Sequence, residues 1–76
     1  MKRVVYYVWW ATTEENDNGT HHKSEPITLP AKAQEKANEM WKTADYVSID
    51  QSFEKYVNGE WETIETKAIE VVWSTD

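Results

Sequence analysis

The sequence predicts an α+β fold with two layers: an antiparallel sheet of three to four strands and one helix packed on one face, in the order β-β-α-β-β. Two observations carry this prediction. Asn-Gly dipeptides stand at residues 18–19 and 58–59, each between segments that can pair as strands, and a segment with helical apolar spacing lies between them. Asn-Gly favours a two-residue hairpin turn, because both turn residues need positive φ. With 76 residues, the chain is expected to form a single domain, 1–76.

The second Asn-Gly predicts a regular hairpin. Counted outward from the turn, opposite charges, aromatic rings and apolar side chains face each other, and such cross-strand pairs each contribute about 0.2–1 kcal/mol. The predicted pairs are Val57 with Glu60, Tyr56 with Trp61, Lys55 with Glu62, Phe53 with Ile64, Asp50 with Lys67, Ile49 with Ala68 and Tyr46 with Val71.

The first Asn-Gly predicts a less regular hairpin. Its register places Glu15 opposite His22 and Trp10 opposite Ile27. Pro26 removes a ladder donor, so the second arm is expected at a sheet edge. Residues 12–24 are polar throughout and are expected to form a mobile loop or the tip of a hairpin.

One amphipathic helix is predicted between the hairpins. Thr28 is the expected N-cap, and Pro30 fits the first turn, where its missing donor costs nothing. Three alanines on the buried stripe predict a close approach of the helix to the sheet. The stripe consists of Leu29, Ala33, Ala37, Met40, Trp41 and Ala44.

The second hairpin is apolar on both faces, and one helix covers only one of them. The face expected under the helix holds Val47, Ile49, Phe53, Val57, Ile64, Ala68 and Val72. The other face is expected to hold Tyr46, Tyr56, Trp61, Ile69, Val71 and Trp73, with Asp50, Glu54, Glu65 and Lys67. Two interpretations remain open: this second face is an interaction surface, or the 12–24 segment folds over it.

Composition excludes several classes of partner and site. The chain has 14 acidic and 8 basic residues, a net charge of −6 and no cysteine. This balance argues against nucleic acid or an anionic membrane as a direct partner. No segment is long and apolar enough for a membrane span, so a cytoplasmic location is expected.

No motif predicts catalysis, a metal or a cofactor. His21 and His22 lie close to Glu14, Glu15 and Asp17, but adjacent strand residues point to opposite faces, which favours two solvated histidines over a metal site. The carboxylates Asp50, Glu54 and Glu65 are expected to be open to water, without the pocket that acid–base catalysis needs. We therefore expect a protein that is not an enzyme.

The preferred function is a non-catalytic, acidic protein-binding module. It would act as an inhibitor or adaptor that occupies a basic groove of a larger enzyme. The expected partner-binding residues are Asp50, Glu54, Tyr56, Trp61, Glu62 and Glu65. Tyr7, Trp9 and Trp73 are the expected self-association surface, with a symmetric homodimer as the commonest outcome of such a surface.

The size, acidity and element order are typical of small proteins that bacteriophages and mobile elements encode, although no motif identifies a family. The alternative function is a homo-oligomer that binds a small planar ligand, such as a nucleotide, between Trp and Tyr rings.

Overall fold

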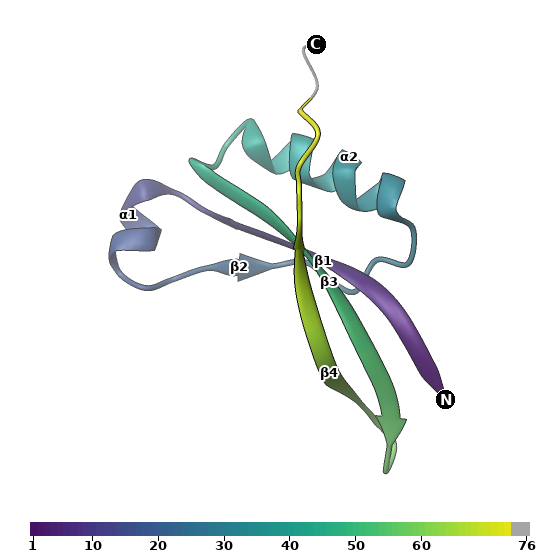
Figure 1. The fold of residues 1–76 in the computed structure, drawn as a ribbon. Coiled ribbons are helices and arrows are strands. Elements are labelled where there is room, and N and C mark those ends of the chain that lie inside the picture. Colours follow the sequence, from purple (N-terminus) through teal and green to yellow (C-terminus); the bar gives the residue numbers. More distant parts are fainter. Residues whose placement is uncertain (74–76) are drawn as a thin grey trace.

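The chain forms a four-stranded antiparallel sheet with one long helix on one side (Figure 1). The computed structural model describes residues 1–73. The element order is β1 (Lys2–Ala11), α1 (Thr13–Asp17), β2 (His22–Lys23), α2 (Pro30–Trp41), β3 (Tyr46–Val57) and β4 (Glu60–Ile69), and the strand order is β2-β1-β3-β4. The α+β class and the antiparallel sheet are confirmed. The observed order differs from the prediction by α1, a short helix inside the first hairpin.

The second hairpin is confirmed close to its turn and differs further out. Asn58 and Gly59 have φ values of 50° and 84°, as the predicted turn requires. The three predicted pairs nearest the turn are present, but beyond them Phe53 faces Glu65 and not Ile64. Ile64 is thus the extra residue of a β-bulge in β4. From there outward the predicted register is wrong by one residue: Asp50 pairs with Ala68 and Ile49 with Ile69.

The first Asn-Gly ends a helix instead of closing a hairpin. Thr12 caps α1 through a reciprocal capping box with Glu15. At the other end Gly19 has a φ of 75°, and the N–H groups of Gly19 and Thr20 donate to the carbonyls of Asn16 and Glu15. This is the Schellman arrangement that glycine favours at a helix C-terminus.

Helix α1 contains residues that the predicted first hairpin would have paired as strand. Trp10 consequently lies opposite His22, and Tyr6 bridges Ile27, so the predicted pairs of the first hairpin are wrong. The segment 12–24, expected as a loop or hairpin tip, contains α1 and β2.

The core lies between α2 and the centre of the sheet. Ala33 and Ala37 are buried against Val8 of β1 and Ile49 of β3, where their small side chains allow the helix to lie close to the strands. The helix begins after Leu29 rather than Thr28, and no side chain caps it. Trp41, expected on the buried stripe of the helix, is half-exposed.

The chain after β4 crosses onto α2. The side-chain amide of Gln34 donates to the carbonyl of Glu70 (2.9 Å) and accepts from the N–H of Val72 (2.8 Å). Trp73 then packs against Trp41, with 4.7 Å between ring centroids. Trp73 therefore lies beside the helix and not on the sheet face of Tyr7 and Trp9, so the three do not form the single self-association surface expected.

Within residues 1–73, neither helix has the length and apolar character needed to cross a membrane.

Candidate functional site

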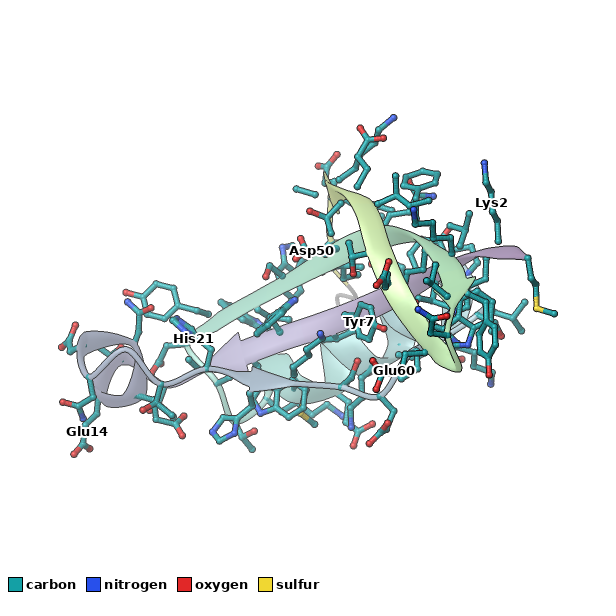
Figure 2. All side chains as sticks on the ribbon, turned by 90° about the horizontal axis from the view of Figure 1, so that it is seen from below. Lys2, Tyr7, Glu14, His21, Asp50 and Glu60 are labelled. Carbon is teal, nitrogen blue, oxygen red and sulfur yellow. The ribbon has the colours of Figure 1, made fainter. Side chains whose placement is uncertain are left out.

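The sheet face opposite α2 is partly covered by the chain itself. Figure 2 views the molecule from below and shows Tyr7 near the middle of the sheet, with Glu14 at the far end beside α1. The ammonium group of Lys23 lies 4.1 Å from the ring centroid of Tyr7 and 5.2 Å from that of Trp9. Tyr7 and Trp9 are half-buried, and Val5, on the same face of β1, is only 1% exposed. The 12–24 segment thus contributes a cation over the two aromatic rings.

A buried carboxylate lies at the centre of this face. Glu54 is 3% exposed, and its two oxygens are fully engaged. Oε1 accepts from Nε (2.8 Å) and contacts Nη2 (2.7 Å) of Arg3, and Oε2 accepts from the hydroxyls of Tyr7 (3.0 Å) and Ser52 (2.9 Å). Each carboxylate oxygen has two donors. The Arg3–Glu54 ion pair, which has no net charge, and the two hydroxyl donors therefore link β1 to β3.

The surroundings fix the protonation states of this cluster. Burial raises the pKa of Glu54, but the hydrogen bonds from Arg3, Ser52 and Tyr7, together with the Arg3 charge, outweigh it and lower the pKa below its ordinary value. Burial and the Glu54 carboxylate raise the pKa of Tyr7, which therefore stays a donor. A carboxylate held ionised and saturated with donors is suited to structural stabilisation rather than to proton transfer.

The prediction that Glu54 is open to water is therefore wrong. Glu54 is one of the six expected partner-binding residues, and its carboxylate is buried. Sequence reasoning also missed its partner Arg3, which lies directly opposite Glu54 in the β1–β3 register. The opposite charges of Arg3 and Glu54 indicate a pair only when β1 is known to lie beside β3.

An aromatic pair flanks the buried cluster at the hairpin end. The rings of Tyr56 and Trp61 meet edge to face at 5.2 Å, as the predicted cross-strand pair required. The guanidinium of Arg3 stacks over Trp61 at 4.2 Å, so Arg3 joins the carboxylate cluster to β4. Tyr56 is 48% exposed and Trp61 is half-buried, which leaves a surface patch of aromatic carbon next to the turn.

The predicted binding residues lie on two faces of the hairpin, and the bulge accounts only for the position of Glu65. Asp50, Tyr56 and Trp61 lie on the face opposite α2. Glu65 pairs with Phe53, and Glu62 pairs with Lys55, which places both glutamates on the other face of the hairpin. The six expected residues therefore do not form one surface.

A row of carboxylates on β4 emerges instead. Glu60, Glu62 and Glu65 are exposed and share one face of β4, and none of them forms an ion pair with another residue of the described chain. Glu60 was not among the predicted binding residues. Its place in the row follows from the hairpin register together with the bulge.

The histidines contact neighbours at the tip of the first hairpin. A ring nitrogen of His22 contacts the carboxylate of Glu15, and the ring of His21 lies 3.0 Å from the side-chain oxygen of Asn16. The backbone N–H of Thr12 and then His22 lower the pKa of Glu15. Residues 1–73 contain no group of three or more side chains placed to hold a metal.

A hollow of about 310 Å³ lies between this tip and the start of β3. Its lining combines aromatic rings with polar side chains. The indole N–H of Trp9, one of the lining residues, is buried and has no hydrogen-bond partner in the described part of the chain. The lining residues are Trp9, Trp10, Ala11, Asn16, His21, Tyr46, Val47 and Ser48.

No protein-family model, curated protein or solved structure matches this chain. The fold defines a small α+β domain.

Proposed function

We propose that this protein is a non-catalytic binding module that captures a larger protein with a basic surface through the β3–β4 hairpin. The carboxylate row on β4 (Glu60, Glu62 and Glu65) is the observation that carries the proposal. Three exposed carboxylates on one face, in a chain of net charge −6, favour encounter with a positively charged surface. Occupation of a basic groove on an enzyme would make the module an inhibitor or adaptor that acts in the cytoplasm.

The charge balance of the hairpin supports this assignment. Glu54 is neutralised internally by Arg3, so it adds nothing to the surface charge. Lys55 faces Glu62 across the hairpin and Lys67 lies over the ring of Phe53, at 5.5 Å from its centroid. The exposed carboxylates consequently outnumber the cations close to them, and they remain available to a partner.

The Tyr56–Trp61 pair supplies the expected apolar anchor. Tyr and Trp are enriched among the residues that dominate binding energy, because they bury a large area with few rotamers to restrict. Trp61 lies between two residues of the carboxylate row along β4, with its ring on the opposite face of the strand, and Tyr56 lies directly across from Trp61. A partner that encloses the hairpin end would cover the rings on one face and the carboxylates on the other.

Truncation of the anchor should weaken capture. In Trp61→Ala, loss of a hot-spot ring is expected to cost about 2 kcal/mol, or about 30-fold in Kd. The measurement is affinity capture from an extract of the source cells, followed by titration of the captured protein at two salt concentrations. Trp41→Ala is the matched control, since it removes an exposed Trp at the helix end. Equal capture by both variants, with no effect of salt, would contradict the proposal.

A second candidate function is binding of a small planar ligand in the hollow. The specific observation in its favour is the combination of Trp9 and Tyr46 rings with an unpartnered indole N–H at a volume near the lower limit of ligand pockets, about 300 Å³. A ligand that binds only the folded chain must raise its melting temperature. A panel of nucleotides and nucleobases should therefore include one that raises Tm and quenches Trp fluorescence, with Trp9→Phe reducing both effects. A panel without any shift would remove this candidate.

A further inference from the structure

We propose that β4 accepts an additional strand: an extended, basic segment of the partner pairs with its free edge. This inference rests on the proposed function and specifies how the partner binds. β4 is the outermost strand in the order β2-β1-β3-β4 and runs for 10 residues, whereas the opposite edge, β2, has only 2. A long edge strand presents a row of unpaired backbone groups that a second chain can complete.

The direction of the backbone groups follows from the β1–β3 ladder. The N–H of Tyr56 donates to the carbonyl of Met1 at 2.9 Å, so Tyr56 directs its backbone groups towards β1. Hydrogen-bonding direction alternates along a strand, and β3 pairs with β1 without a register shift. The backbone N–H and C=O groups of Glu54, Ser52 and Asp50 therefore also point towards β1. The β4 residues opposite them consequently form no backbone hydrogen bonds with β3.

The partners of these residues turn their backbone groups outward. Trp61, Thr63, Thr66 and Ala68 lie opposite Tyr56, Glu54, Ser52 and Asp50, respectively. Their N–H and C=O groups form the free edge, and the side chains of β4 are exposed over most of its length. The part of the chain that the structure describes contributes no strand on this side.

The side chains of β4 select the occupant by charge. The carboxylate row occupies one face, whereas the outward-facing residues carry one aromatic and three small uncharged side chains on the other. A complementary strand would alternate Lys or Arg with Val or Thr, because residues directly opposite share a face. A second copy of this chain would bring three carboxylates and one cation, Lys67, to the same face of β4, so like charges would predominate and its pairing is disfavoured. A β-bulge generally hinders the pairing of an edge strand with another strand. The bulge at Ile64 leaves Glu65–Ile69 as a regular stretch that can still pair.

The probe is a synthetic ten-residue peptide of alternating Lys and Val, with a peptide of alternating Glu and Val as the control. Both are titrated into the full chain labelled with ¹⁵N. The Lys peptide is expected to slow hydrogen exchange of the Thr66 and Ala68 amides at least tenfold, because these amides become ladder donors. The Glu peptide should leave them unchanged.

Two substitutions at one position separate backbone pairing from charge attraction. Thr66→Pro removes an outward-facing N–H without removing a bond to β3, and is expected to weaken binding at least tenfold. Thr66→Ala keeps the N–H and should bind like the unmodified chain. If Thr66→Pro does not fold, the exchange measurement on the unmodified chain decides alone, because it requires no substitution.

Each alternative result overturns strand addition. These results are equal binding by Thr66→Pro and Thr66→Ala, binding without protection of the two amides, or no binding by either peptide. Protection that rises with protein concentration alone would identify a second copy as the occupant and would also overturn it. The proposed function is judged separately by the Trp61→Ala capture: Trp61-dependent capture with an unprotected edge would leave that function standing and reject only strand addition.

Discussion

Ile49→Ala is expected to destabilise the fold by about 3 kcal/mol, within the usual range for an Ile removed from a core. Ile49 is 1% exposed and packs with Val8, Ala33 and Ala37, and the two alanines cannot move inward to fill the vacated volume without shifting α2. A domain of 76 residues has a total stability of roughly 4–11 kcal/mol, so the loss is a large share of it. Urea unfolding followed by Trp fluorescence should show a lower midpoint with an unchanged slope.

Ile64→Ala is the matched control, since it makes the same chemical change at the β4 bulge. Ile64 is 53% exposed, and its truncation is expected to change stability by less than about 0.5 kcal/mol. The register predicted from sequence placed Ile49 and Ile64 on the same buried face. A loss at Ile64 comparable to that at Ile49 would restore that register and contradict the bulge.

Local signals account for what sequence reasoning predicted correctly. The turn at Asn58-Gly59 and the three pairs beside it depend on φ preferences and on neighbours close in sequence. The helix stripe likewise depends on the spacing of Ala33 and Ala37 within one segment. Such features are determined before strand order is known, because no distant segment contributes to them.

One inserted residue explains most of what was predicted wrongly about the faces. Side chains alternate along a strand, so the bulge at Ile64 moves every later residue of β4 to the opposite face. Glu65 and Lys67 leave the face of Asp50, and Ile69 reaches the core. Nothing in the residues 60–69 marks the bulge, since the unbulged register pairs equally sensible side chains.

The first hairpin was misassigned because one dipeptide serves two structures. Asn-Gly closes a two-residue turn, but glycine with positive φ also ends a helix. The sequence Thr12-Thr13-Glu14-Glu15 carries the signature of a capping box, and this signal decides between the two structures. Recognition of that box would have predicted α1 and, with it, the shorter β2.

The buried Arg3–Glu54 pair could not be predicted from residue types alone. The residues are 51 apart in sequence, and the contact depends on β1 lying beside β3. A charged residue on a hairpin is exposed far more often than buried unless a partner is known. The binding role assigned to Glu54 followed from that general rule.

Removal of Arg3 is the second large effect expected. Arg3→Ala leaves Glu54, which is buried in the unmodified chain, with only the Tyr7 and Ser52 hydroxyls as donors, and it removes the stacking over Trp61. Loss of one member of a buried pair typically costs about 3–5 kcal/mol, and the partial exposure of Arg3 favours the lower end, about 3 kcal/mol. Lys2→Ala, one residue away and exposed, should change stability little. The double variant Arg3→Ala, Glu54→Gln should recover part of the loss, because no buried charge remains.

The pH dependence of unfolding identifies the cause of that loss. In the unmodified chain the pKa of Glu54 is below its ordinary value of 4.5, so its stabilisation is present at neutral pH and is lost as the pH falls below about 4.5. Burial is the largest single influence on this pKa, and without Arg3 only the Ser52 and Tyr7 hydroxyls oppose it, so we expect the pKa to rise above its ordinary value. The folded state then binds a proton more readily than the unfolded state, so acidification from pH 7 towards pH 5 should stabilise Arg3→Ala while it leaves the unmodified chain unchanged. The measurement is the free energy of unfolding in urea at pH 7, 6 and 5 for Arg3→Ala and for the double variant, which lacks the titrating group. Parallel pH profiles for the two would show that the loss comes from packing over Trp61 and not from the uncompensated Glu54 carboxylate.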